Sequence, residues 1–105
     1  MLSVVVPVKN EEDNILPLLE EIHAALDGRI EFEVIYVNDG STDRSWQLIE
    51  LAARQASCIH GIKLSANRGQ QNALLAALFH VKGDAVITLD ADLQDDVGAI
   101  REMVI

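Results

Sequence analysis

Short hydrophobic runs and amphipathic segments alternate along this chain, and this alternation constrains its fold more than any other feature. Four runs rich in β-branched residues predict strands: LSVVVPV (2–8), FEVIYVN (32–38), CIHGIKL (58–64) and DAVITLD (84–90). Between them, apolar residues recur at helical spacing over residues 15–26, 48–56 and 73–81. We therefore expect an α/β fold, with a mostly parallel sheet, right-handed crossovers and helices on both faces.

Residues at the borders of the helical segments agree with this pattern. Gly28 and Gly83 stand where the first and third helices should end, because glycine readily adopts the left-handed conformation that terminates helices. Asp13, Ser41 and Asn67 stand near the expected helix starts, and their side chains are able to cap a helix N-terminus. The borders therefore predict the same three helices as the periodicity.

A fourth helical pattern begins in VGAIREMVI, residues 97–105. With it, the expected order is β-α-β-α-β-α-β-α, and the length of 105 residues corresponds to a single domain over residues 1–105. The sequence ends inside this apolar pattern, so we expect a fragment truncated at its C-terminus or a domain that a partner completes. Self-association into a homo-oligomer through this helix is one such outcome.

Charge and composition exclude several classes of function. Seventeen acidic residues against eight basic ones give a net charge of −9, which disfavours binding to nucleic acids and anionic lipid surfaces. The single cysteine, Cys58, cannot form an internal disulfide, as expected for a reducing compartment. The apolar runs are shorter than the roughly 18 residues of a membrane span, and the N-terminus lacks the basic segment of a signal peptide. We therefore expect a cytoplasmic chain.

The carboxyl ends of all four expected strands lead into polar loops. These loops are residues 9–12, 38–41, 65–69 and 90–94. Solvation and helix capping account for any one polar loop. In an open parallel sheet, however, ligands bind in the crevice beyond these strand ends. Four polar loops at one edge of the sheet therefore predict a binding site there.

The last of these loops is strongly acidic. ITLDADLQDD, residues 87–96, places four aspartates within seven positions, and such crowding is costly unless a cation lies among them. We expect Asp90 and Asp92, two residues apart just beyond a strand, to face the same crevice. Carboxylate and amide oxygens suit a hard ion such as Mg²⁺ or Mn²⁺. Such an ion would allow an acidic edge to bind a diphosphate.

Other nucleotide and metal motifs are absent from the sequence. The turn after the first strand, VKNEEDN, has no glycine and so lacks the dinucleotide-binding fingerprint, and no P-loop occurs. His23, His60 and His80 show no metal-ligand spacing, and with Cys58 they predict no soft-metal site. A metal-bridged phosphate site at the acidic edge remains the best-supported chemistry.

Four motifs give the chain a family resemblance. They are PVKNE (7–11), NDGSTD (38–43), NRGQQNA (67–73) and DADLQ (90–94). In order and spacing they resemble the donor-binding half of family 2 glycosyltransferases, across essentially the whole chain. Within this family the chain is most similar to the polyprenyl-phosphate sugar transferases, such as dolichol-phosphate mannose synthase and its bacterial undecaprenyl-phosphate relatives.

The resemblance implies a Rossmann-like half of a GT-A fold and an inverting transfer of a sugar. The donor would be a UDP- or GDP-linked sugar, and the acceptor a polyprenyl phosphate. By position in the motifs, Pro7, Val8 and Glu11 would line the nucleoside pocket. Asp39 would accept a hydrogen bond from the base.

The same resemblance assigns residues to the diphosphate and the metal. Arg68 and Gly69 would lie along the path of the sugar diphosphate, and Asp90 would face the ribose or the metal. Asp92 and Gln94 would bind a divalent Mg²⁺ or Mn²⁺ ion that bridges the two donor phosphates. The resemblance therefore predicts a metal-dependent donor site with Asp90, Asp92 and Gln94 as its ligands.

The chain departs from the family pattern after DADLQ, where residues 95–98 replace a proline pair and an acid. The acceptor site, any catalytic base and the membrane helices of the lipid-phosphate branch would lie beyond residue 105. The catalytic residues are therefore not assigned within this chain. Full-length relatives of this branch are expected on the cytoplasmic face of the membrane.

Two other functions fit parts of the sequence. The first is a non-catalytic fragment that binds a nucleotide and associates through residues 97–105. The second is a receiver-like signalling module, which is also a small parallel α/β domain with an acidic Mg²⁺ pocket. A receiver needs a phosphoacceptor aspartate after the third strand, whereas this chain has Ser-Ala-Asn at residues 65–67. Neither function accounts for all four loops.

Overall fold

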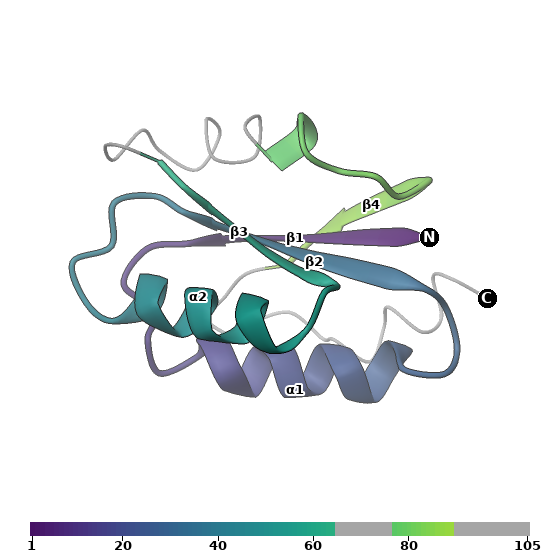
Figure 1. Cartoon of the computed structure of the whole chain (residues 1–105), viewed down its shortest axis with the longest axis horizontal. Coiled ribbons are helices and arrows are strands. Elements are labelled where there is room, and N and C mark those ends of the chain that lie inside the picture. The colour runs from purple at the N-terminus through teal and green to yellow at the C-terminus, as the bar shows by residue number, and fades with distance from the viewer. Residues whose placement is uncertain (65–76, 90–105) are drawn as a thin grey trace.

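The described part of the chain contains six regular elements (Figure 1). The computed structural model describes residues 1–64 and 77–89. In chain order the elements are β1 (Leu2–Val8), α1 (Ile15–Leu26), β2 (Phe32–Asn38), α2 (Ser45–Gln55), β3 (Ile59–Lys63) and β4 (Ala85–Thr88). The four predicted strands and the first two predicted helices are confirmed, with β3 and β4 slightly shorter than expected.

The four strands form one parallel sheet in the order β3-β2-β1-β4. β1 pairs with all seven residues of β2, ending with Val8 opposite Asn38, and with the four residues of β4, ending with Val5 opposite Thr88. The chain builds the sheet outward from β1 to β3 and then returns to the other side of β1 for β4. The strand order therefore reverses between β1 and β4, and open parallel sheets bind ligands at such a switch point.

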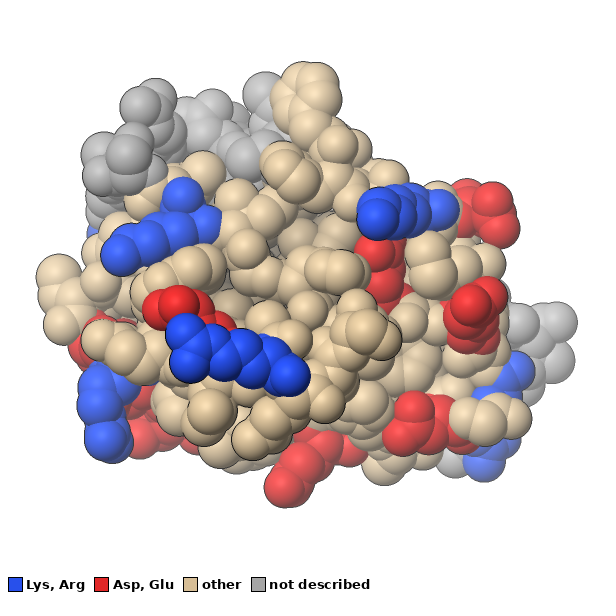
Figure 2. Space-filling view, viewed as in Figure 1, with Lys and Arg blue, Asp and Glu red and all other residues tan. Residues whose placement is uncertain are grey.

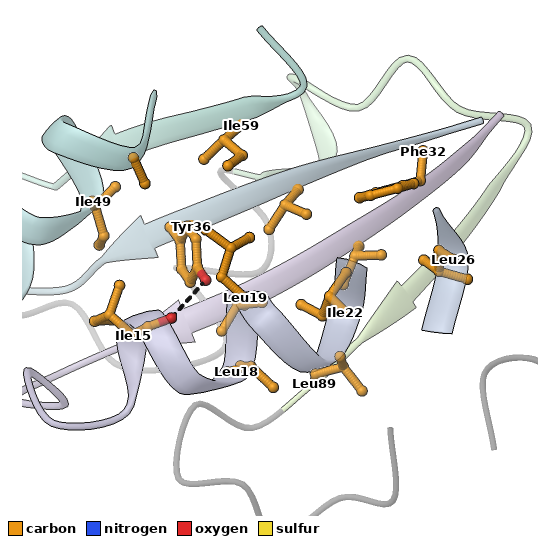
Figure 3. Packing of buried hydrophobic residues seen from close by; sticks show 14 of the residues in the cluster. Ile15, Leu18, Leu19, Ile22, Leu26, Phe32, Tyr36, Ile49, Ile59 and Leu89 are labelled. Atoms are coloured by element: carbon orange, nitrogen blue, oxygen red, sulfur yellow. Dashed lines mark hydrogen bonds between the residues drawn. The ribbon is translucent and has the colours of Figure 1, made fainter. Parts of the chain in front are cut away.

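Helices α1 and α2 cover the same face of the sheet (Figures 1 and 3). The Tyr36 hydroxyl is buried beneath them and donates a hydrogen bond to the Ile15 carbonyl at 3.2 Å (Figure 3). Burial raises the pKa of Tyr36, so the phenol stays neutral and joins β2 to the start of α1. The apolar layer around it includes Val4, Val6, Leu18, Ile22, Leu26, Val34, Ile49 and Ile59.

The opposite face of the sheet carries a second, smaller apolar layer. Val5, Ile35 and Val37 pack there against Ala77. Ala77 belongs to the connection between β3 and β4, which has to pass from one edge of the sheet to the other. Ala77 therefore covers part of this face, whereas the two complete helices of the described part lie on the other face.

The third predicted helix is described only at its end. Residues 73–76 lie outside the described ranges, while Ala77 and the residue after it are helical. The His80 N–H donates to the Ala77 carbonyl at 2.9 Å, and this i to i+3 hydrogen bond closes the segment as a turn. The prediction that the helix extends to Val81 is therefore wrong. The fourth predicted helix, within residues 97–105, lies outside the described part.

The helix starts differ from the predicted caps. α1 begins after Asn14 and α2 begins after Arg44, and neither of these side chains caps its helix. The prediction that Asp13 and Ser41 cap these helices is therefore wrong. Ser41 Oγ instead accepts a hydrogen bond from the Asn10 N–H at 3.0 Å, because the loops before the two helices lie against each other.

Gly28 terminates α1 as predicted. Its φ of +74° lies in the left-handed region, two residues beyond Leu26. The N–H groups of Arg29 and Ile30 both donate to the Leu26 carbonyl, at 3.0 and 3.2 Å. The third predicted cap, Asn67, lies outside the described residues.

A buried carboxylate attaches the start of β4 to the sheet. Glu33 on β2 is only 3% exposed, and its Oε2 accepts hydrogen bonds from the Ser3 hydroxyl at 2.5 Å and the Lys82 N–H at 2.7 Å. The Gly83 N–H donates to Ser3 Oγ at 2.9 Å. Burial alone would raise the pKa of Glu33, but these hydrogen bonds and the neighbouring His60 lower it below its ordinary value. Glu33 therefore holds this segment as a charged group.

Acid should weaken the fold by protonating Glu33. Because the folded-state pKa is lowered, the stabilisation is complete above the unfolded-state value of 4.5 and is lost as the pH falls through the folded-state pKa. We expect Glu33→Gln to be less stable than the native chain at pH 7 and to lose less stability on acidification. Urea unfolding at a series of pH values measures both effects. Equal pH dependence in the two proteins would contradict the assignment.

Gly83 is required because the backbone passes too close to β1 for a side chain. A Cβ at this position would lie 2.5 Å from Ser3 Oγ and 2.7 Å from the Met1 carbonyl oxygen. We expect Gly83→Ala to lower the free energy of unfolding by up to about 3 kcal/mol, because packed backbone has to move.

The matched control for this substitution is Gly28→Ala. Its Cβ would meet nothing within 4 Å, so only the positive φ of +74° is strained, at a cost of about 1–2 kcal/mol. Urea denaturation at pH 7 compares the two variants. A smaller loss for Gly83→Ala than for Gly28→Ala would show that the contact with β1 is easily relieved.

Candidate functional site

Strand pairing continues to the carboxyl edge of the sheet, where the polar loops begin. The Asp39 N–H donates to the Val8 carbonyl at 2.9 Å, one residue beyond β2. The Leu89 N–H donates to the Val5 carbonyl at 3.0 Å, one residue beyond β4. Because β1 lies between β2 and β4, the ends of all three strands reach the same edge (Figure 1). This is the edge at which the sequence predicts a binding site.

Asn10 joins the loop after β1 (residues 9–14) to the loop after β2 (residues 39–44). Its Oδ1 accepts hydrogen bonds from the Thr42 N–H at 2.7 Å and the Thr42 hydroxyl at 3.3 Å. Its own N–H donates to Ser41 Oγ at 3.0 Å. The φ of Asn10 is +55°, a left-handed conformation that asparagine tolerates better than most residues. Both the backbone N–H and the side chain of Asn10 therefore form hydrogen bonds between the two loops.

Asp43 and Ser45 provide a second set of links. The buried Ser45 Oγ accepts from the Glu11 N–H at 2.9 Å. Asp43 accepts from the Glu12 N–H at 3.2 Å through Oδ2 and from the Ser45 N–H at 2.9 Å through Oδ1. Slight burial opposes the charge of Asp43, but these hydrogen bonds outweigh it and lower its pKa. Asp43 is thus a carboxylate at the N-terminus of α2, where negative charge is favourable.

Two acidic side chains of the first loop, Glu11 and Glu12, also have partners. Glu11 Oε2 accepts from Asn14 Nδ2 at 2.8 Å, and Glu12 Oε2 accepts from Arg44 Nε at 3.2 Å. The Arg44 side chain is 81% exposed, so this ion pair adds little to stability. Glu11 therefore braces the first loop, and Glu12 links it to the start of α2.

Four of the predicted nucleoside-binding residues lie together at this edge. Pro7 and Val8 end β1, Glu11 is half-buried in the next loop, and Asp39 is 5% exposed directly after β2. The structure therefore brings these residues to adjoining strand ends, and their contact with a nucleoside stays a prediction. The other predicted site residues lie outside the described part of the chain: Arg68, Gly69, Asp90, Asp92 and Gln94.

Asn38 adds a buried acceptor to the same end of the sheet. This last residue of β2 is 1% exposed, and its Oδ1 has no hydrogen-bond partner within residues 1–64 and 77–89. A buried acceptor without a partner costs about 1–3 kcal/mol. Asn38 therefore leaves a hydrogen-bonding position beside Asp39 that the described protein groups do not use.

The described residues do not supply a metal centre. Within residues 1–64 and 77–89, no group of three or more His, Cys, Asp or Glu residues could hold a metal ion. The predicted ligands Asp90, Asp92 and Gln94 follow directly after this part. The metal site therefore stays a prediction from the sequence.

The described surface shows mixed charge. On the face in Figure 2, Lys and Arg side chains are interspersed with Asp and Glu and do not merge into one basic area. The Lys63 ammonium on β3 lies 5.8 Å from the centre of a Trp46 ring, a cation–π contact between β3 and α2. None of the helices in the described ranges is long and apolar enough to cross a membrane.

Sequence reasoning missed the residues that fasten the loops together: Asn10, Asp43 and Ser45. Asparagine, aspartate and serine are all favoured in turns, and this preference was the only signal in the sequence that could have indicated their role. Their partners lie 31 to 34 residues away in the chain. Periodicity does not reveal which amide a distant hydroxyl or carboxylate will accept from, so these pairings required the structure.

The buried Ser45 hydroxyl can be tested directly. We expect Ser45→Ala to lower the free energy of unfolding by about 1–3 kcal/mol, because the Glu11 N–H loses its acceptor. The matched control is Ser57→Ala at an exposed position before β3, which should change stability by less than about 0.5 kcal/mol. Urea denaturation measures both variants. Equal stability of the two would show that the Glu11 amide finds another partner.

Comparison with known families matches residues 3–104 to a family model described as "Glycosyl transferase family 2". The undecaprenyl-phosphate 4-deoxy-4-formamido-L-arabinose transferase of Edwardsiella ictaluri is 44% identical over 105 residues, which cover 98% of this chain and 32% of that protein. An uncharacterized glycosyltransferase of Bacillus subtilis, YkoT, is 38% identical over 100% of this chain and 34% of its own length. The chain thus spans about a third of these relatives.

Solved structures match the fold over nearly the whole chain. A mannosyltransferase from Pyrobaculum calidifontis, in complex with GDP-Man and Mn²⁺, aligns with a TM-score of 0.84 and 28% identity, covering 98% of this chain and 31% of that one. S. aureus TarS 1–349 in complex with UDP aligns with a TM-score of 0.82 and 28% identity, covering 98% and 30%. The architecture is therefore a GT-A-like α/β fold.

Proposed function

Because the chain belongs to glycosyltransferase family 2, we propose that it is the donor-binding part of an inverting sugar transferase. The donor is a nucleotide-diphosphate sugar, the acceptor a polyprenyl phosphate, and a divalent metal assists the transfer. One observation carries this proposal: the linked loops after β1 and β2 bring Pro7, Val8, Glu11 and Asp39 to one edge of the sheet. This edge adjoins the switch point between β1 and β4.

The nucleoside would bind across the ends of β1 and β2. The Asp39 carboxylate would accept a hydrogen bond from a base N–H, since an ionised carboxylate only accepts. Pro7, Val8 and Glu11 would surround the nucleoside. Supporting this proposal, the similar Pyrobaculum mannosyltransferase was solved with GDP-Man, and TarS with UDP and with UDP-GlcNAc.

The diphosphate would lie toward the end of β4, past Arg68 and Gly69. Asp90, Asp92 and Gln94 have the oxygen ligands that Mg²⁺ and Mn²⁺ prefer. A metal bound there would act as a Lewis acid that stabilises the departing nucleoside diphosphate. The Mn²⁺ named with the Pyrobaculum mannosyltransferase supports a metal-dependent donor site.

The acceptor would be a polyprenyl phosphate, as the name of the similar Edwardsiella undecaprenyl-phosphate transferase suggests. A phosphate acceptor is already anionic at neutral pH, so the transfer needs no strong general base. Such a reaction would take place at the cytoplasmic face of a membrane. Since the chain spans 32% of that relative, acceptor binding and turnover are properties we propose for the whole enzyme.

A second candidate is a nucleotide-binding chain without turnover. It rests on the same linked loops after β1 and β2, which would bind the nucleoside, whereas no residue of this chain is assigned to the acceptor. Association through the apolar pattern of residues 97–105 would accompany this function. Sugar transfer from the bound donor to a polyprenyl phosphate by the purified chain would exclude this candidate.

Calorimetric titration tests the donor site. UDP, GDP and their sugars are titrated into the chain with and without Mn²⁺, and into Asp92→Asn. We expect metal-dependent binding of one nucleotide series, weakened about tenfold or more in Asp92→Asn, since a metal ligand loses its charge. The control is Asp27→Asn, which changes charge equally at the C-terminal end of α1 and should bind like the native chain.

Each other outcome contradicts part of the proposal. Binding that does not depend on Mn²⁺ would exclude the metal from donor recognition. Equal weakening by Asp27→Asn and Asp92→Asn would point to overall charge in place of a ligand. No binding to the folded chain would show that these residues do not form a donor site.

A further inference from the structure

Asn10 adopts a strained backbone conformation at the site. Among the residues that the structure describes, it is the one non-glycine residue with a positive φ, at +55°. Glycine would adopt this conformation at less cost. The presence of asparagine at this position is therefore best explained by what its side chain does.

The Asn10 side chain holds the middle of the loop after β2, residues 39–44. Its Oδ1 accepts hydrogen bonds from the Thr42 N–H at 2.7 Å and from the Thr42 hydroxyl at 3.3 Å, and the Asp43 N–H approaches it at 3.4 Å. The Asn10 N–H adds a bond to Ser41 Oγ at 3.0 Å. One residue of the first loop thus contacts three consecutive residues of the second.

The ends of the same loop are attached separately. Asp39 is held at the start by its hydrogen bond to the Val8 carbonyl, and Ser45 at the far end by its bond from the Glu11 N–H. Between them lies Gly40, with a φ of +75°, a residue with wide conformational freedom. Without the Asn10 side chain, Thr42 would lose the acceptor of both of its hydrogen bonds, whereas the backbone N–H of residue 10 could still donate to Ser41.

From this geometry we infer that Asn10 is a positioning residue: it presets the loop that begins at Asp39 for binding a nucleobase. This role rests on the proposed function of the site. If only a fraction of molecules holds the loop in the binding conformation, the apparent dissociation constant rises by the inverse of that fraction. Asn10 would therefore increase donor affinity without touching the donor.

Two substitutions separate the backbone of Asn10 from its side chain. Asn10→Gly keeps the left-handed conformation accessible and removes the acceptor. Asn10→Asp keeps both an acceptor oxygen and tolerance of positive φ. The control is Gly28→Ala, which strains another residue of positive φ at the opposite end of α1 and leaves both loops unchanged.

Amide hydrogen exchange and nucleotide titration are measured on each full chain. In Asn10→Gly we expect the Thr42 amide to exchange about tenfold faster and the affinity for UDP or GDP to fall about tenfold. Asn10→Asp should restore slow exchange at Thr42. The binding of the Asn10→Asp variant is measured with uridine or guanosine, because these nucleosides have no phosphate that the added negative charge would repel. Gly28→Ala should match the native chain in both measurements.

The outcomes that overturn the inference are distinct from failure of the donor site. Unchanged exchange at Thr42 in Asn10→Gly would show that Asn10 does not hold the loop. Faster exchange with unchanged affinity would show that the loop is not preset for the base. If the native chain binds neither nucleotide, the donor-site proposal is wrong and the role in base binding fails with it. The exchange data then still show whether Asn10 holds the loop.

Discussion

The pairing of β1 with strands on both of its sides is the constraint on which the rest of the structure depends. β1 is parallel to β2 and to β4 and lies between the two apolar layers. Its neighbours are parallel, so each connection has to return to the amino edge before the next strand begins. The carboxyl ends of β1, β2 and β4 therefore meet at one edge, and the switch point between β1 and β4 lies there.

The two ends of this sheet use the same kind of interaction for different purposes. At the amino end, Glu33 and Ser3 accept hydrogen bonds from backbone amides and attach the start of β4. At the carboxyl end, Asn10, Asp43 and Ser45 accept from amides of the facing loops. In each case a side-chain oxygen satisfies an amide far away in the sequence. Irregular backbone is thereby held in one conformation beside a rigid sheet.

Net charge has to be reconciled with an anionic donor. The chain carries a net charge of −9, yet the proposed ligand is a nucleotide diphosphate. Glu33 and Asp43 keep their negative charge and accept hydrogen bonds from amides, and Glu12 pairs with Arg44. The aspartates after β4 are the acids for which a bound cation is proposed, and such a cation would offset their repulsion of the donor phosphates.

The sequence by itself determined the strands and the first two helices, because hydrophobic periodicity and turn-forming residues are local properties of the chain. It also determined the edge of the sheet at which Pro7, Val8, Glu11 and Asp39 lie. Its motifs also predicted the family. The extent of the third helix and the caps of α1 and α2 were predicted wrongly, since tertiary contacts decide them. Only the tertiary structure placed β4 beside β1 and showed Asn10 reaching Thr42, 32 positions away. Such contacts depend on which strands become neighbours in the sheet, and hydrophobic periodicity does not reveal the order of the strands.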